Sequence, residues 1–143
     1  MYADKAAVAG PTLNFPIAHH CMVQVADNAI YLIGGKQSGE MSSQVWVVDP
    51  TDGFKVKQGP SLREKRYFHS CAVMEDGKTG SKKIVVAGGF GPAESGAVEI
   101  LDTKTQNNEW ARGNPYFDIF YLMLCCANSS GQFWHFKSSK TAV

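Results

Sequence analysis

Short apolar runs separated by turn-forming residues recur along the chain. The first half shows four such runs, at 21–25, 29–33, 45–49 and 54–57. The second half shows four more, at about 70–74, 84–87, 97–101 and around Trp110. Val, Ile, Tyr and Trp dominate these runs, as strands prefer, and no segment keeps the 3.6-residue period of a helix. The pattern therefore predicts an all-β chain with two sets of four strands.

The two sets of strands belong to two copies of one sequence unit. The first copy contains Gly10, Pro11, Leu13 and His20, which recur 49 positions later as Gly59, Pro60, Leu62 and His69. Each copy continues with an apolar run that ends in Gly-Gly, a strand-like segment that ends in aspartate, an aromatic residue and a proline. A fixed period of this size marks a repeat architecture. The second unit also carries a charged, glycine-rich insert at 76–83, which predicts a surface hairpin loop.

This order of residues resembles the kelch repeat. In the first unit the matching residues are His20, Tyr31, Gly34, Gly35, Asp49 and Phe54. In the second unit they are Arg66, His69, Gly88, Gly89, Val98, Asp102 and Trp110. The resemblance implies four-stranded blades of a β-propeller, at about 50 residues per blade. The first unit departs from the family pattern, because Ile17 stands where the second unit has Arg66, and Phe54 replaces the usual tryptophan.

The repeats divide the chain into four segments: an N-terminal remnant at 1–9, a first unit at 10–58, a second unit at 59–115 and a tail at 116–143. The tail is either the degenerate start of a third blade or unrelated sequence. Propellers close with about 4 to 8 blades, so two blades leave strand edges open. We therefore expect an incomplete kelch-type β-propeller of two four-stranded antiparallel blades, which self-associates through its open edges.

The double glycines at 34–35 and 88–89 are expected to have a structural function. Glycine permits a positive φ and has no Cβ, so a strand that ends in two glycines can turn sharply against a neighbouring aromatic ring. Phe54 and Trp110 are the expected neighbours. A phosphate-binding loop is not predicted, because no helix begins after the glycines.

Charge and composition argue against several classes of function. The chain carries 14 basic and 13 acidic side chains, so no basic excess indicates nucleic-acid binding. No signal peptide is visible, and the longest apolar stretch, at 116–127, is shorter than the roughly 20 residues of a membrane span. The sequence predicts a soluble protein with no membrane partner. Its compartment is undetermined, with the cytoplasm slightly favoured.

The cysteines and histidines do not indicate a metal centre. His20 and His69 occupy equivalent repeat positions, which explains them without a metal. Cys21 and Cys71 are expected to be small unpaired residues packed on strands, with disulfides in a secreted relative as the alternative. No metal, cofactor or catalytic motif is predicted, so the chain is not expected to be an enzyme. The alternatives are a fragment of a galactose-oxidase-like copper enzyme and a truncated product without independent function.

A protein-binding surface is the remaining candidate site. In kelch-type propellers, partners often bind loops between blades and between the second and third strands, which the resemblance places at 58–68, 36–43 and 90–96. The candidate partner-binding residues are Lys36, Gln37, Arg63, Lys65, Arg66, Tyr67 and Phe90. Arginine and tyrosine are favoured at interface hot spots. Because three cations lie within 63–66, the expected partner is a protein that presents an acidic peptide, although Arg66 also matches the structural arginine of the repeat.

Overall fold

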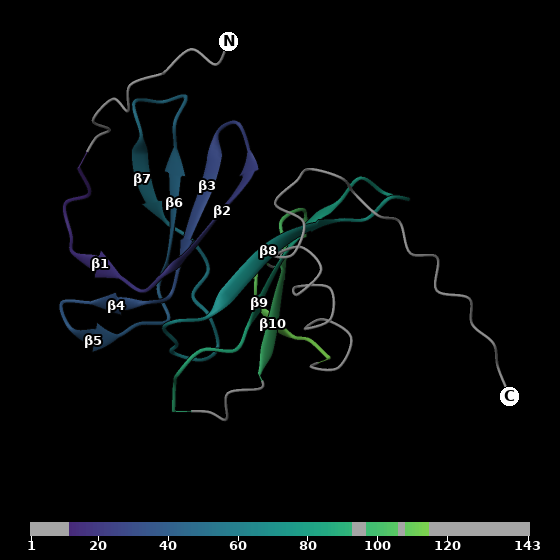
Figure 1. Ribbon diagram of the computed structural model, residues 1–143. Helices are drawn as coiled ribbons and strands as arrows, with labels where there is room; N and C mark the ends of the chain where they lie inside the picture. Colours follow the sequence, from purple (N-terminus) through teal and green to yellow (C-terminus); the bar gives the residue numbers. More distant parts are fainter. Residues whose placement is uncertain (1–11, 93–96, 106–107, 115–143) are drawn as a thin grey trace, which may run out of the picture.

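The computed structural model describes residues 12–92, 97–105 and 108–114. Over these ranges the chain forms two four-stranded antiparallel sheets and one small three-stranded sheet, with no helix (Figure 1). The prediction of an all-β chain with two four-stranded antiparallel sheets is confirmed. The expected N-terminal remnant at 1–9 and the tail at 116–143 lie outside the described residues.

The first sheet is a meander in the order β2-β3-β6-β7. Its strands are β2 (Cys21–Ala26), β3 (Ala29–Ile33), β6 (Val45–Asp49) and β7 (Lys55–Gln58). Each end of these strands lies within one residue of its predicted position. Val45, Val47 and Val48 are all buried, so both faces of β6 are covered. This strand is therefore a central element of the sheet, with β7 as the edge.

The second sheet repeats this order with β8 (Ser70–Glu75), β9 (Lys82–Ala87), β10 (Val98–Asp102) and β11 (Ala111–Arg112). Lys82 and Lys83, predicted in a surface loop, instead pair with Glu75 and Met74 of β8. The loop is shorter than expected because the ladder between β8 and β9 continues through these lysines. The Lys82 ammonium group also donates to the carbonyl oxygen of Val25 in the first sheet, at 2.7 Å.

A small sheet of β1 (Ile17–Ala18), β4 (Lys36–Gln37) and β5 (Glu40–Met41) was not predicted. It forms where Ala18 pairs with Lys36, just after the double glycine of the first unit. The second unit has the same contact in a shorter form, as an isolated bridge between Tyr67 and Phe90. The two pairs are repeat equivalents, because their members are 49 and 54 positions apart in the chain.

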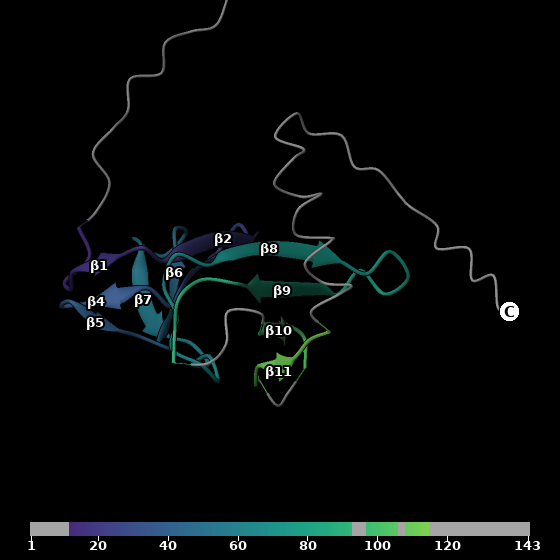
Figure 2. The same cartoon turned by 60° about the horizontal axis from the view of Figure 1, so that its bottom comes forward.

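The two four-stranded sheets meet through their first strands, β2 and β8, which lie next to each other (Figure 2). Side chains from both units share one buried cluster, which contains Val25, Ile33, Val45, Leu62, Ile84, Val86, Leu101 and Trp110. Leu62 enters this cluster from the linker between the units and is 4% exposed. Because burial of apolar surface drives folding, the shared cluster couples the two sheets.

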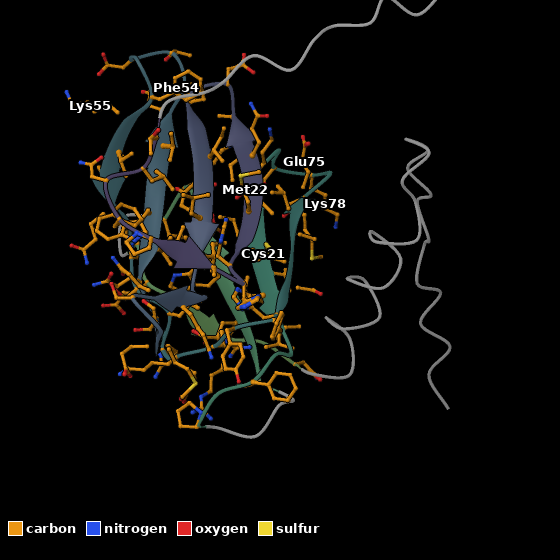
Figure 3. The ribbon with its side chains drawn as sticks, turned by 60° about the vertical axis from the view of Figure 1, so that its left-hand side comes forward. Cys21, Met22, Phe54, Lys55, Glu75 and Lys78 are labelled. Atoms are coloured by element: carbon orange, nitrogen blue, oxygen red, sulfur yellow. A yellow bond between two sulfur atoms is a disulfide. The ribbon has the colours of Figure 1, made fainter. Side chains whose placement is uncertain are left out.

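A disulfide also joins the two sheets. It links Cys21 of β2 to Cys71 of β8, with the Cα atoms 6.0 Å apart (Cys21 is labelled in Figure 3). The favoured interpretation of two separate buried cysteines therefore gives way to the alternative, a disulfide, because the first strands of the two units lie side by side and bring the thiols together. The bond spans 50 positions of sequence, and a crosslink of that span stabilises a fold by roughly 4 kcal/mol through lost chain entropy of the unfolded state.

The aromatic residues that close the two units have different surroundings. Trp110 is 2% exposed, and its indole N–H donates to the carbonyl oxygen of Pro60 at 2.7 Å. Phe54 is 44% exposed and lies in the turn before β7, with a φ of 60° (Figure 3). The prediction that Phe54 packs inside the first unit, against its double glycine, is therefore wrong. Val56 pairs with Val48, the residue before the repeat aspartate. Gly59 and Gly113 donate to the equivalent carbonyl oxygens of Val45 and Val98, and because Val56 and Trp110 each lie three residues before that glycine, Val56 stands in the place of Trp110.

The second glycine of the Gly88–Gly89 pair lies against backbone rather than against an aromatic ring. A Cβ atom placed on Gly89 would lie 2.6 Å from the carbonyl oxygen of Tyr67 and 2.8 Å from Cβ of His69. Gly89 also has a φ of 86°, which L-residues rarely adopt. The expected contact with Trp110 is thus replaced by contact with the segment that precedes β8.

Gly89→Ala should lower the free energy of unfolding by more than about 2 kcal/mol, because the new methyl group would meet backbone that is held by the Tyr67–Phe90 bridge. Gly88→Ala is the matched control, since its φ is 70° and its Cβ would meet no atom within 4 Å. The control should lose only about 1 kcal/mol, the cost of a left-handed residue. Urea unfolding followed by tryptophan fluorescence measures both losses. Equal losses would show that φ alone requires glycine here.

Candidate functional site

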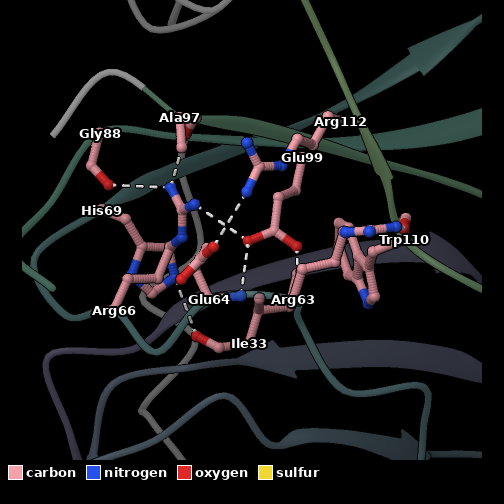
Figure 4. Close-up of polar contacts among 10 residues, drawn as sticks. All are labelled: Ile33, Arg63, Glu64, Arg66, His69, Gly88, Ala97, Glu99, Trp110 and Arg112. Atoms are coloured by element: carbon pink, nitrogen blue, oxygen red, sulfur yellow. Dashed lines mark hydrogen bonds and ion pairs between the residues drawn. The ribbon is translucent and has the colours of Figure 1, made fainter. Parts of the chain in front are cut away.

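The linker between the two sheets carries four of the predicted binding residues, and a buried carboxylate holds its backbone. Glu99 of β10 is 1% exposed. Its carboxylate accepts the backbone N–H of Arg63 at 2.7 Å and that of Glu64 at 3.2 Å. It also accepts a hydrogen bond from the Arg66 guanidinium at 3.0 Å (Figure 4). Three donors therefore satisfy one buried charge, which offsets the cost of removing that charge from water.

Arg66 lies inside the protein, with 4% of its surface exposed. Its guanidinium also donates to the carbonyl oxygens of Gly88, at 3.1 Å, and Ala97, at 2.8 Å (Figure 4). The backbone carbonyl of Arg66 accepts the N–H of Gly35 at 2.8 Å, so this residue connects the linker to both units. A buried guanidinium is not available to a partner. Arg66 therefore leaves the set of candidate binding residues and has a structural function.

His69 forms a second polar contact between the units. Its ring Nε2 lies 3.0 Å from the carbonyl oxygen of Ile33, and because a carbonyl can only accept, Nε2 carries the proton. Burial, together with the nearby charge of Arg66, lowers the pKa of His69 from its usual value of 6.5 to about 4. Burial also lowers the pKa of its repeat equivalent, His20. At pH 7 the His69 imidazole is therefore a neutral donor that connects the residue before β8 to β3.

The repeat aspartates hold the turns that follow the third strand of each sheet. Asp49 accepts hydrogen bonds from the Thr51 hydroxyl at 2.6 Å and the Thr51 N–H at 2.9 Å. Asp102 accepts the N–H of Lys104 at 3.0 Å and the Ser81 hydroxyl at 3.1 Å. The hydroxyl of Thr51 and the N–H of Lys104 are the main reasons that the pKa of each carboxyl is lowered. Both carboxylates therefore hold the fold of the turns next to them.

Beside the linker, four rings from both units meet at the surface. Tyr67 and Phe90 exchange backbone hydrogen bonds of 3.0 and 2.8 Å, and their rings stack with centroids 5.6 Å apart. The Phe68 ring lies 5.3 Å from that of Tyr67 and 4.0 Å from that of His19. The Phe68 N–H also donates to the His19 carbonyl oxygen at 3.1 Å, which joins the two units at this point. Phe68 and Phe90 are 58% and 63% exposed.

A lysine from the first unit completes this cluster. The Lys36 ammonium lies 4.5 Å from the centroid of the Tyr67 ring, which is a cation–π contact. Lys36 belongs to β4 and Tyr67 to the end of the linker, so this contact also crosses between the units. We call His19, Lys36, Tyr67, Phe68 and Phe90 together the aromatic surface.

The backbone at His19 and Phe68 follows the repeat. The two residues are 49 positions apart, and each has a φ of 54°. A non-glycine residue with positive φ is strained, and it keeps that conformation only where its surroundings hold it. In both units the next residue is the repeat histidine, His20 or His69, which is less exposed. The strained residue therefore presents a ring to solvent while the following imidazole packs toward the interior.

Three predicted binding residues, Lys36, Tyr67 and Phe90, lie together in the aromatic surface although they come from three separate segments. Gln37 follows Lys36 on β4, pairs with Ile17 and is partly buried. This grouping arises because the residues before the first strand pair with the residues after the double glycine in both units. The structure thus brings three of the seven predicted binding residues to one place on the surface.

The remaining linker cations, Lys65 and Arg63, have different neighbours. Lys65 is exposed, and a Cβ atom placed on Gly91 would clash with its carbonyl oxygen, so Lys65 lies beside the chain that follows Phe90. Arg63 is also exposed, and its guanidinium donates to the carbonyl oxygen of Trp110 at 3.4 Å. With Arg66 buried, the cations beside the rings are Lys36, which lies over the Tyr67 ring, and Lys65, which lies beside the chain that follows Phe90.

His19, Phe68 and Glu99 were not predicted as residues of this region. A signal existed for the first two, because a ring precedes the repeat histidine in both units. Glu99 gave no such signal, since its equivalent 53 positions earlier is Trp46. Trp46 has another partner, because its ring stacks on that of Phe15 with centroids 4.6 Å apart. The segment that enters the first sheet is therefore held by ring stacking, and the linker into the second sheet by an ion pair.

The described part of the chain exposes a group of aromatic rings at its surface. Across its ranges, no group of three or more His, Cys, Asp or Glu side chains is placed to hold a metal ion. The same residues include no helix that is long and apolar enough to cross a membrane. What the aromatic surface exposes to solvent is rings and one ammonium group, which can bind another molecule by packing and by charge.

Glu99→Gln should lower the free energy of unfolding by about 3 kcal/mol, because it leaves the buried Arg66 charge without a counter-charge. Glu64→Gln is the matched control, since Glu64 pairs at 3.3 Å with an exposed Arg112. That exposed pair should contribute less than about 1 kcal/mol. Chemical denaturation at pH 7 compares the two variants. Similar losses would mean that the buried carboxylate does not organise the linker.

Protonation of His69 should destabilise the fold. Its pKa is lower in the folded state, so the unfolded chain binds more protons between pH 6.5 and about 4, and stability falls as the pH decreases through this window. The expected loss is roughly 2 to 3 kcal/mol between pH 7 and pH 4. His69→Gln keeps a donor for Ile33 and should reduce this dependence in urea titrations at several pH values. If the pH dependence of the free energy of unfolding is unchanged in His69→Gln, titratable groups other than His69 cause it.

Comparison with known proteins gives a partial match. No family model matches the chain. An F-box/kelch-repeat protein of Arabidopsis thaliana is 38% identical to the chain over 92 residues, which is 64% of this chain and 23% of the relative's length. The chain is therefore similar, over nearly two thirds of its length, to a protein named for its kelch repeats, and it matches less than a quarter of that protein.

Proposed function

We propose that the chain is part of a kelch-type β-propeller and binds a protein partner through the aromatic surface. Two lines support the propeller. One is the similarity to an F-box/kelch-repeat protein. The other is a pair of four-stranded antiparallel sheets of equal strand order, joined through their first strands. Each sheet corresponds to one blade in this proposal.

The exposure of the aromatic surface is the observation that carries the binding proposal. Phe68 and Phe90 are 58% and 63% exposed, although apolar rings of this size favour burial. Clusters of exposed apolar side chains mark interaction sites, and aromatic residues are enriched at the centres of interfaces. Both units contribute to the cluster, so the surface is a property of their packing. A partner that covers these rings would gain the apolar burial that the chain alone leaves unused.

We further propose that the partner segment is acidic as well as apolar. Lys36 lies over the Tyr67 ring, and the exposed Lys65 lies beside the chain that follows Phe90. Charges of opposite sign on a partner would steer its encounter with the rings and select its orientation. The linker supplies fewer free cations than its sequence suggested, because Arg66 is paired with Glu99. The predicted acidic partner therefore depends on lysines at the edge of the aromatic surface.

Self-association through open strand edges is a separate proposal. Lys55 and Lys57 are exposed on β7, the edge strand of the first sheet. Charged residues on an edge strand disfavour pairing with another strand. We therefore expect partners to bind the aromatic surface rather than this edge.

The double variant Phe68→Ala/Phe90→Ala should lose proteins that the wild-type chain captures from an extract of cells that express it. Phe54→Ala is the matched control, because Phe54 is also exposed but lies in the turn before β7, outside the aromatic surface. Quantitative mass spectrometry of the captured proteins should show at least a tenfold loss for the double variant, equal to about 1.4 kcal/mol, and no loss for the control. Capture that is equal for all three chains would contradict binding at this surface.

Charge is tested in the same experiment. Lys65→Glu should weaken capture at low salt and reduce the difference between low and moderate salt, because the pairing of exposed charges is screened by ions. If Lys65→Glu captures partners as well as wild type at every salt concentration, the proposal of an acidic partner is wrong, and binding through the rings alone remains.

A further inference from the structure

The Cys21–Cys71 disulfide lies close to the place where the two units build the aromatic surface. Cys21 is two residues after His19, and Cys71 is three residues after Phe68. The His19 and Phe68 rings are in contact, with centroids 4.0 Å apart, and the backbone hydrogen bond between these residues crosses from one unit to the other. The crosslink and the ring contact therefore connect the same two segments.

The segments next to the crosslink are strained. His19 and Phe68 both have a φ of 54°, a conformation that non-glycine residues adopt only when their surroundings impose it. A covalent bond between β2 and β8 restricts the separation of these strands and so helps to impose it. If the bond is broken, His19 and Phe68 can relax to ordinary backbone angles. The hydrogen bond from the Phe68 N–H to the His19 carbonyl oxygen would then weaken or break.

Both cysteines are partly exposed, so a soluble reductant can reach the bond. A thiolate of a dithiol reductant attacks one sulfur and forms a mixed disulfide with one cysteine, while the other cysteine leaves as a thiolate. The second thiolate of the reductant then displaces the first cysteine. Two electrons pass to the cysteines, two protons are taken up, and the reductant becomes a disulfide. No further cofactor is needed.

We propose that Cys21–Cys71 is a redox modification site that controls the aromatic surface. With the disulfide formed, β2 and β8 are held together and the rings of the two units form one surface. With the disulfide reduced, each four-stranded sheet keeps its own hydrogen-bond ladder, but the contact between His19 and Phe68 opens. The effect on a partner rests on the proposed function, whereas the change in the surface itself does not.

Hydrogen exchange of the chain with Cys125→Ser and Cys126→Ser tests this, because only the Cys21–Cys71 pair then responds to reductant. Addition of dithiothreitol should accelerate exchange of the Phe68 N–H at least tenfold. Amides within β9, such as that of Val85, should change less than about threefold, since their partners lie within one sheet. Cys21→Ser should show the fast Phe68 exchange without reductant and no further response to it.

Three results would overturn the proposal. The first is that the air-oxidised protein contains no Cys21–Cys71 bond by peptide mapping. The second is that Phe68 exchange is unchanged on reduction. The third is that Phe68 and β9 amides accelerate equally, because the bond would then stabilise the whole fold rather than the surface. If reduction accelerates Phe68 exchange more than β9 exchange but the chain captures no partner, only the proposed function is contradicted.

Discussion

The contact between the buried Glu99 carboxylate and the linker is the interaction on which the joining of the two sheets depends. Glu99 is removed from water, so it must be met by donors, and three of them come from the stretch that contains Arg63, Glu64 and Arg66. This requirement fixes the path of the linker over β10. The same path places Leu62 in the shared core. The hydrogen bonds to Glu99 thus determine where Leu62 enters the core.

The aromatic surface follows from this arrangement. The linker ends at Tyr67 and Phe68, and both residues contact parts of the first unit, through Lys36 and His19 respectively. Neither unit alone contains the complete set of rings and cation. The form of this surface consequently depends on the packing between the sheets, and residues far from the rings can affect it.

The sequence was sufficient for the strands of the two four-stranded sheets, because their apolar runs and the double glycines recur in both units, but it did not predict the small sheet of β1, β4 and β5. It was not sufficient for contacts between units. Cys21 and Cys71 are not repeat equivalents, so the period gave no reason to pair them; only the neighbouring positions of β2 and β8 do. Phe54 and Trp110 each lie shortly before a proline, yet the shorter turn of the first sheet places Val56 in the position of Trp110.

The candidate site was predictable to a similar extent. Tyr67 and Phe90 could be named as loop residues, but their stacking depends on a bridge between distant backbone segments. Arg66 could be recognised as the repeat arginine, whereas its partner Glu99 differs from Trp46 at the same position of the first unit. Contacts of this kind join residues that differ between the two units, so the residues that recur along the sequence do not reveal them.

The two different anchors have a consequence for how this chain could have evolved or could be recombined. The segment entering the first sheet is held by Phe15 against Trp46, and the linker entering the second by Arg66 against Glu99. A unit moved to the other position with the wrong entering segment would bury a lone charge against an indole. Each sheet and the segment that precedes it therefore form one inheritable module, and the boundaries at which such modules can be exchanged lie before the entering segment rather than at the first strand.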